Sequence, residues 1–298
     1  MYNQKKILFV GGAPKCGTSA LFDLLLQTER FETAYKKETF YFIDDDYPLM
    51  NKEKNYGKNG INEFYNLFQE KENLVGLEGT THLLYQKEMP EILKDIDCKI
   101  IFILRDPAER IQSSFEYTKN NLSNFKEPIT FQTYVNLLLA DKKMEIENKM
   151  KYTSSRWVLA NELYLSNYNY FLDNWYKFFS TGDILLIDYT KFKNNPIDQL
   201  NKISHFTNLD FNLESVNNNQ RNKTSTIRNK NVHYFFRSIN KIVPDNTLKQ
   251  SFKKAYFKLQ RISKKDNPDD KIALDRLKQY FEEKEISVIN TLKTYKNW

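Results

Sequence analysis

A short glycine-containing segment near the N-terminus carries residues suited to binding a phosphate-like group. Residues 11–20 read Gly-Gly-Ala-Pro-Lys-Cys-Gly-Thr-Ser-Ala and lie between an apolar strand-like run and an apolar helix start. Backbone N–H groups at such a turn and at a helix N-terminus point into one concavity, which suits phosphate or sulfate. A nucleoside-triphosphate P-loop places its lysine directly after the second glycine, whereas Lys15 precedes Gly17 by two residues. The segment therefore predicts an anion cradle without the spacing of a nucleoside triphosphatase.

A second segment joins a buried strand to an arginine and a serine. Residues 100–115 read Ile-Ile-Phe-Ile-Leu-Arg-Asp-Pro-Ala-Glu-Arg-Ile-Gln-Ser-Ser-Phe, and the proline suits the first position of a helix. Arg105 at the strand end and Ser113, about two helical turns later, could bind one phosphate through charge-assisted hydrogen bonds. Open α/β sheets bind ligands at this edge. Taken alone, the segment is better explained by an Arg105–Asp106 ion pair and a solvated serine.

Together and in this order, the two segments resemble those of the sulfotransferases that use 3′-phosphoadenosine 5′-phosphosulfate (PAPS). The resemblance implies that the first loop holds the 5′-phosphosulfate, with the lysine over the sulfuryl oxygens. It implies that the arginine and serine of the second segment hold the 3′-phosphate. The product is then 3′-phosphoadenosine 5′-phosphate (PAP). No metal is expected, because a lysine and a helix N-terminus already supply positive charge. The residues expected to bind the donor are Pro14, Lys15, Cys16, Gly17, Thr18, Ser19, Ala20, Arg105 and Ser113.

Two further segments are similar to bacterial and glycan-type members, such as the heparan sulfate sulfotransferases. Residues 36–42 look like their Lys-Glu-x-x-Phe-Phe segment, and residues 77–85 look like Gly-Glu-x-Ser/Thr-Pro-x-Tyr. The second match is loose, because Leu77, Thr81 and Leu83 replace glycine, proline and tyrosine. The resemblance implies a carbohydrate or glycan acceptor.

An acceptor hydroxyl or amine loses a proton as it attacks sulfur, so a general base is expected. Glu38 matches the family's glutamate, and the adjacent Lys37 could orient it. His82 is the second candidate, because some relatives use a histidine and the ordinary pKa of histidine suits the task. With Lys15, these two residues make up the predicted catalytic set. A surface Lys37–Glu38 ion pair and a packing role for His82 remain open alternatives.

The C-terminal part of the chain is strongly basic. Residues 220–298 carry 19 Lys/Arg and 8 Asp/Glu, in a chain whose net charge is +7. Residues 222–228 resemble the loop that closes over the nucleotide in bacterial members, so Lys223 and Arg228 are expected to bind the donor. A solvated basic surface explains the same charges. Residues 247–262 have an amphipathic helical pattern, which suits packing on the domain or contact with a membrane surface.

The distribution of apolar runs predicts the fold. Short strands that are apolar at consecutive positions, separated by amphipathic helices, indicate a parallel sheet buried on both faces. We expect one α/β domain over residues 1–298, a three-layer P-loop-like fold with a mainly parallel central sheet flanked by helices and a helical C-terminal extension. Residues 44–58 and 141–152 are expected to be surface loops or insertions over the sheet edge. Strands are expected at 7–10, 74–77, 99–104 and 183–188, and helices at 19–28, 62–68, 107–120, 131–139, 163–179 and 197–207.

Composition narrows the class of protein. A hydrophobic content of 40% and an aromatic content of 15% are typical of a folded globular chain. Cys16 and Cys98 cannot form a disulfide framework, and no window is apolar enough to span a membrane, so a cytoplasmic location is expected.

The alternatives to a sulfotransferase are a P-loop kinase or NTPase, a non-catalytic nucleotide- or glycan-binding protein, and a nucleic-acid-binding module. The last lacks a recognition motif. The expected partner is an acceptor glycan or small molecule, and the oligomeric state is left open.

Overall fold

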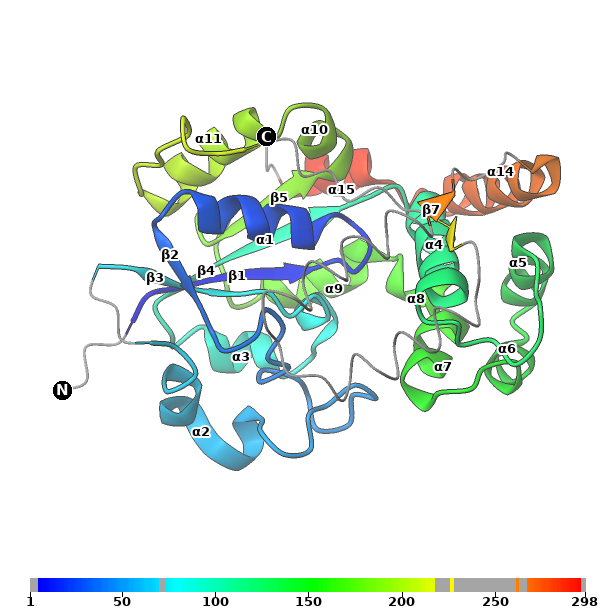
Figure 1. Ribbon diagram of the computed structural model, residues 1–298, viewed down its shortest axis with the longest axis horizontal. Helices are drawn as coiled ribbons and strands as arrows, with labels where there is room; N and C mark the ends of the chain where they lie inside the picture. The colour runs from blue at the N-terminus through cyan, green and yellow to red at the C-terminus, as the bar shows by residue number, and fades with distance from the viewer. Residues whose placement is uncertain (1–4, 70–72, 218–225, 228–260, 263–266, 296–298) are drawn as a thin grey trace. The chain divides into compact units, whose positions relative to one another are not determined.

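The computed structural model describes residues 5–69, 73–217, 226–227, 261–262 and 267–295 (Figure 1). The chain forms two compact units. The first contains Met1–Arg110, Leu163–Arg221 and Lys278–Trp298, and the second contains Ile111–Glu162 and Asn222–Leu277. The single domain expected over the whole chain stays a prediction.

A parallel sheet forms the centre of the first unit and confirms the predicted α/β fold. Among the described residues it has five strands, and β1 is buried along its whole length. Phe9 of β1 lies between Glu78 and Ile100 of its two neighbours, and every pairing in this sheet is parallel. Central strands with helices on both faces need apolar residues at consecutive positions, as seen here. Across the sheet, the strands are β2 (Phe31–Thr33), β3 (Val75–Glu78), β1 (Ile7–Gly12), β4 (Cys98–Leu104) and β5 (Ile184–Asp188).

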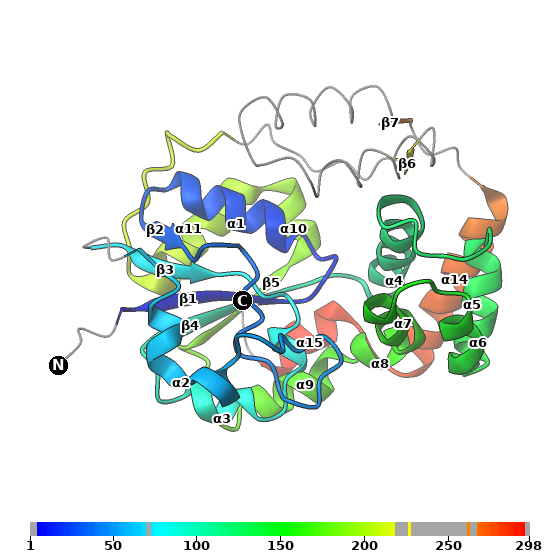
Figure 2. The same cartoon turned by 60° about the horizontal axis from the view of Figure 1, so that its bottom comes forward.

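Helices cover both faces of this sheet and give the predicted layers (Figures 1 and 2). One face carries α1 (Thr18–Gln27), α10 (Tyr189–Asn194) and α11 (Pro196–Thr207). The other carries α2 (Tyr56–Tyr65), α3 (Met89–Leu93) and α9 (Tyr168–Trp175). The short helix η1 (Leu83–Tyr85) lies between β3 and α3 along the chain, and the short helix α8 (Glu162–Leu165) precedes α9. None of the helices in the described part of the chain is long and apolar enough to cross a membrane.

The second unit is mainly helical. Helix α4 (Pro107–Glu116) begins at the predicted proline and continues into a π-helical turn, Tyr117–Asn121. Phe115 packs its ring against Phe131 and Tyr134, at centroid distances of 5.4 and 5.1 Å. These rings join α4 to α5 (Phe131–Leu139). Helices α6 (Lys143–Asn148) and α7 (Thr153–Ala160) follow α5 along the chain.

The expectation of a loop over residues 141–152 was wrong, because α6 lies within that segment. Its sequence, Lys-Met-Glu-Ile-Glu-Asn, places one buried residue, Ile146, among exposed or half-buried ones. One buried apolar residue in such a short segment does not repeat at helical spacing, so the sequence pattern does not predict this helix.

The C-terminal part is helical, as expected, with α14 (Pro268–Glu283) and α15 (Val288–Thr294). The short strands β6 (Thr226–Ile227) and β7 (Arg261–Ile262) pair antiparallel. Of the predicted amphipathic helix over residues 247–262, only the last two residues are described, and these belong to β7.

Candidate active site

The loop between β1 and α1 has the backbone geometry of an anion cradle. Lys15 has φ 70° and Gly17 has φ 90°, both in the left-handed region. A Cβ added at Gly17 would lie 3.0 Å from a ring carbon of Tyr189, so glycine suits this position in both conformation and space. Helix α1 then begins without a side-chain cap from the described residues. The N–H groups of its first turn therefore keep their capacity to bind an anion.

Cys16 holds this loop against the strand that ends near Arg105. Its thiol is fully buried, which raises the pKa of Cys16 to about 11. The sulfur lies 4.0 Å from the Tyr168 hydroxyl, which donates to the Arg105 carbonyl at 2.8 Å. The Cys16 N–H bonds within the loop, to Ala13 O at 3.2 Å. Cys16 therefore positions the loop, and its neutral thiol is no nucleophile.

Arg105 follows the last residue of β4 and is half-buried. Its Nε and Nη2 donate to Glu109 Oε2 at 3.2 and 3.0 Å, so its carboxylate partner is Glu109 and not Asp106. Asp106 instead accepts the Glu109 N–H in the first turn of α4. The Arg105 guanidinium also lies 4.8 Å over the centre of the Tyr189 ring. Ser113 is half-buried on α4, within the second unit.

Tyr189 joins the two predicted halves of the donor site within the first unit. Its ring limits the space at Gly17 and stacks under Arg105. Tyr189 is not among the site residues expected from the sequence. The available signal was its position directly after β5, at the carboxyl edge of the sheet.

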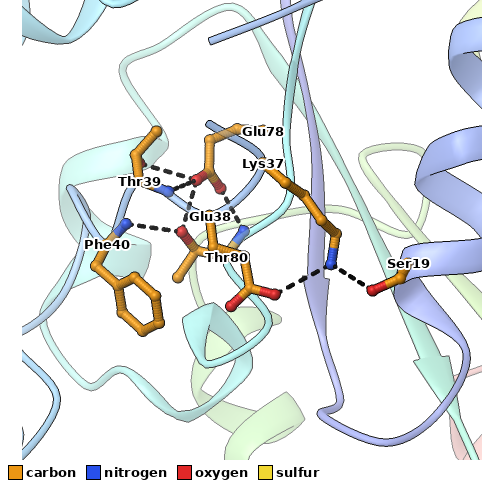
Figure 3. Close-up of polar contacts among 7 residues, drawn as sticks. All are labelled: Ser19, Lys37, Glu38, Thr39, Phe40, Glu78 and Thr80. Carbon is orange, nitrogen blue, oxygen red and sulfur yellow. Dashed lines mark hydrogen bonds and ion pairs between the residues drawn. The ribbon is translucent and has the colours of Figure 1, made fainter. Parts of the chain in front are cut away.

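Lys37 connects the loop to the predicted base (Figure 3). Its Nζ donates to Ser19 Oγ at 3.2 Å and to Glu38 Oε1 at 3.1 Å. The Lys37 side chain passes close to Gly79, where an added Cβ would lie 2.9 Å from Lys37 Cγ. The cation, the hydroxyl at the start of α1 and the carboxylate therefore form one connected group. The predicted Lys37–Glu38 pairing is present, and it extends to the anion-binding loop.

Glu78, buried at the end of β3, fixes the backbone beside Glu38 (Figure 3). It accepts from the N–H and hydroxyl of Thr39 at 2.9 and 2.8 Å, and from those of Thr80 at 2.8 and 2.6 Å. Thr80 Oγ1 in turn accepts the Phe40 N–H at 3.0 Å. Burial raises the pKa of Glu78, and these hydrogen bonds oppose the rise. The sequence placed Glu78 in a family-like segment but gave no sign that it anchors residues 39–40.

His82 is buried behind the same segment, with 8% of its surface exposed. Its Nδ1 lies 2.8 Å from the Tyr47 hydroxyl, and its ring lies 6.5 Å from that of Phe40, centre to centre. Burial, and then the charge of Arg110, lower the pKa of His82 to about 3. The imidazole is therefore neutral near pH 7 and packs under Phe40 and Tyr47.

The remaining predicted donor residues, Lys223 and Arg228, lie outside the described residues. Within the described residues, no group of three His, Cys, Asp or Glu side chains could hold a metal ion. The expectation that no metal is needed stays a prediction.

A parallel sheet with an anion-cradle loop between its first strand and the following helix is a P-loop-like arrangement. A family model for the sulfotransferase domain matches residues 5–282, and the chain belongs to this family. This membership confirms the predicted enzyme class, a PAPS-dependent sulfotransferase. It also argues against the P-loop kinase or NTPase alternative.

Solved structures share the fold. A sulfotransferase from Alicyclobacillus acidocaldarius matches with a TM-score of 0.58 and 18% identity, over 79% of this chain and 91% of that one. The sulfotransferase domain of the Synechococcus PCC 7002 olefin synthase gives a TM-score of 0.48 and 11% identity, over 93% and 96% of the two chains. Mouse SULT7A1, solved in complex with PAP, gives 0.43 and 21%, over 71% and 60%. The first of these matches supports the fold.

Proposed function

We propose that this protein transfers the sulfuryl group of PAPS to a hydroxyl or amine of a carbohydrate or glycan acceptor, by in-line displacement. The observation that carries this proposal is the connected group Ser19–Lys37–Glu38. It places a carboxylate able to accept a proton beside the loop that is suited to the donor. The glycan-like Lys-Glu segment supports the acceptor class.

On the donor side, the chain supplies positive charge and oriented N–H groups. The N–H groups of Gly17, Thr18 and Ser19 bind the 5′-phosphate, and Lys15 binds the sulfuryl oxygens. Arg105 binds the 3′-phosphate, and Ser113 is assigned to the same group by its resemblance to the family's serine. Lys223 and Arg228 are assigned to the nucleotide by their resemblance to the closing loop. PAPS supplies the activated sulfuryl group.

On the acceptor side, Glu38 accepts the proton that the acceptor O–H or N–H releases. A bond forms from the acceptor oxygen or nitrogen to sulfur while the bond from sulfur to the bridging oxygen breaks. Lys15 and the loop N–H groups stabilise the negative charge that develops on the departing phosphate, as in phosphoryl transfer. Lys37 holds the Glu38 carboxylate in place. Glu38 suits the role of base better than His82, because its side chain is 32% exposed whereas His82 is buried.

Calorimetry with PAP tests the donor site. PAP keeps both phosphates but lacks the sulfuryl group, so we expect Arg105→Ala to weaken PAP binding by roughly tenfold or more, since a charge-assisted hydrogen bond contributes about 1.5–3 kcal/mol. Lys15→Ala is expected to weaken it much less. Lys94→Ala, at an exposed position after α3, is the control. Failure of the wild-type protein to bind PAP would contradict the proposed function.

A further inference from the structure

The main chain of Arg105 lies at the point where β4 leaves the sheet. In the described part of the sheet, β4 and β5 pair up to Leu104 and Asp188, and the Arg105 carbonyl lies one residue further. A backbone carbonyl that leaves a ladder inside a fold needs a hydrogen-bond donor from elsewhere. The Tyr168 hydroxyl supplies it, at 2.8 Å. The peptide group that follows Arg105 is therefore held by a side chain from a segment 63 residues further along the chain.

Helix α9 holds the Tyr168 ring in place. Tyr168 is the first residue of this helix and is fully buried. Trp175 follows it by seven residues, about two turns, so both side chains lie on one face of α9. The Trp175 ring packs on Phe102 of β4 at a centroid distance of 5.3 Å, and its Nε1 donates to the Leu84 carbonyl at 2.9 Å. These contacts hold α9 against the strand that ends beside Arg105 (Figure 2).

The single proton of the Tyr168 hydroxyl goes to Arg105. Burial, and then Cys16, raise the pKa of Tyr168 well above its ordinary value, so the hydroxyl stays protonated. The Cys16 sulfur lies 4.0 Å away and is a weaker acceptor than the carbonyl. The loop after β1 has hydrogen bonds of its own, from the Ala13 N–H to the Ile103 carbonyl at 2.8 Å and from the Cys16 N–H to the Ala13 carbonyl at 3.2 Å. Tyr168 therefore acts on Arg105 more than on this loop.

The side chain of Arg105 depends on this main-chain hydrogen bond. The guanidinium donates to Glu109 at 3.0 Å and lies 4.8 Å over the Tyr189 ring, and both contacts constrain only the far end of the side chain. The Tyr168 hydroxyl constrains the other end, where the side chain leaves the backbone. Without it, the peptide group can rotate about the soft backbone dihedrals and redirect the side chain. Charge-assisted hydrogen bonds to a phosphate span only about 2.7–2.9 Å, so a small displacement weakens them.

We propose that Tyr168 is a positioning residue for recognition of the 3′-phosphate: its hydroxyl holds the Arg105 main chain so that the guanidinium reaches this phosphate. The inference rests on the proposed function, because it concerns the donor of the same reaction. The loop after β1 binds the 5′-phosphate of a nucleotide with or without a 3′-phosphate. Tyr168 therefore helps to select nucleotides that carry both phosphates.

Calorimetry with two nucleotides tests this role. PAP carries both phosphates, and adenosine 5′-phosphate (AMP) carries only the 5′-phosphate. Tyr168→Phe removes the hydroxyl and keeps the buried ring. Tyr134→Phe is the matched control, because Tyr134 is also fully buried and its hydroxyl donates to a backbone carbonyl, that of Leu159, at 2.9 Å. The two variants lose the same kind of hydrogen bond, so urea unfolding should show similar losses of stability.

We expect the wild type to bind PAP more tightly than AMP. Tyr168→Phe should raise the Kd for PAP by about fivefold, less than the loss expected for Arg105→Ala, and should leave the Kd for AMP within about twofold. The double variant Tyr168→Phe/Arg105→Ala should bind PAP no more weakly than Arg105→Ala, because the hydroxyl acts through the guanidinium. Tyr134→Phe should change neither Kd.

Four results would overturn the inference while leaving the proposed function in place, since the wild type binds PAP in all of them. Tyr168→Phe could leave the Kd for PAP unchanged, or weaken PAP and AMP binding equally. The effects of Tyr168→Phe and Arg105→Ala on PAP binding could be fully additive. Tyr134→Phe could weaken PAP binding as much as Tyr168→Phe does. Failure of the wild-type protein to bind PAP would instead contradict the proposed function itself.

Discussion

Arg105 contacts two neighbours with different consequences for anion binding. Its guanidinium donates to Glu109 at 3.0 and 3.2 Å and stacks on Tyr189. The ring contact is a cation–π interaction with the Tyr189 side chain, whereas Glu109 accepts from the N–H groups. Because Nε and Nη2 already donate to Glu109, a phosphate that binds these groups competes with the Glu109 carboxylate.

Removing this competitor should tighten nucleotide binding. The Glu109 side chain is 43% exposed, and ion pairs of this kind contribute about 0.2–1 kcal/mol. We expect Glu109→Gln to lower the Kd for PAP by roughly 1.5- to 5-fold, measured by calorimetry. Glu88→Gln, at an exposed position before α3, should leave the Kd unchanged. An unchanged Kd in Glu109→Gln would show that Glu109 does not compete with the phosphate, and a higher Kd would show that Glu109 helps to orient Arg105.

Sequence alone identified candidate residues only where a motif contained them. Lys15, Glu38 and Arg105 stand at strand ends or turns with a recognisable spacing. Glu78 and Tyr189 act through contacts with distant segments, at Thr39 and Gly17. A carboxylate or an aromatic ring at the end of a strand belongs to no motif of fixed spacing. The roles of Glu78 and Tyr189 could therefore be recognised only from the structure.

At the scale of elements, the end of β3 supports the segment that carries the proposed base. Glu78 binds Thr39 and Thr80, and Thr80 binds Phe40. In Glu78→Gln, an amide NH₂ replaces one carboxylate oxygen, so a donor such as the Thr80 N–H loses its acceptor. A buried unsatisfied donor costs about 1–3 kcal/mol.

We expect Glu78→Gln to lower kcat by roughly tenfold, because small misplacements of a catalytic group are costly. The Kd for PAP should change by less than about twofold, since the loop after β1 is held separately. Steady-state kinetics and calorimetry measure the two effects. If kcat and PAP affinity fell in parallel, Glu78 would be a general support of the fold and not a positioning residue.

Elements with a clear apolar pattern were predicted well. The helix expected over residues 131–139 matches α5, and the strand expected over 99–104 differs from β4 by one residue. The helix expected over 163–179 is instead split into α8 and α9, because Ser166 and Asn167 interrupt it. Ser166 accepts a hydrogen bond from buried Arg110 at 2.6 Å. Strand β2 was missed, since three residues are too few for a periodic signal.

At the scale of the whole molecule, burial of His82 makes stability depend on pH. The native-state pKa of His82 is about 3, whereas the ordinary value for histidine is 6.5. The unfolded chain therefore binds a proton below about pH 6.5 that the native protein excludes, and stability falls as the pH decreases. The slope for this residue is at most about 1.4 kcal/mol per pH unit.

Urea unfolding between about pH 7 and pH 5, above the range where most carboxylates titrate, measures this slope. We expect His82→Asn to flatten it. His205→Asn, at an exposed position of α11, should keep the wild-type slope. An equal slope in the wild type and His82→Asn would mean that another group causes the loss of stability.

The central claim is that Glu38 accepts the acceptor's proton while the loop after β1 binds the donor. The most direct measurement is transfer of the radiolabelled sulfuryl group from PAPS by the wild type and by Glu38→Gln, with PAP binding measured on the same samples. The wild type should transfer the label. Glu38→Gln should bind PAP with nearly the same affinity and transfer roughly 100-fold or more slowly, as expected when a general base is lost. Full transfer by Glu38→Gln would contradict the claim.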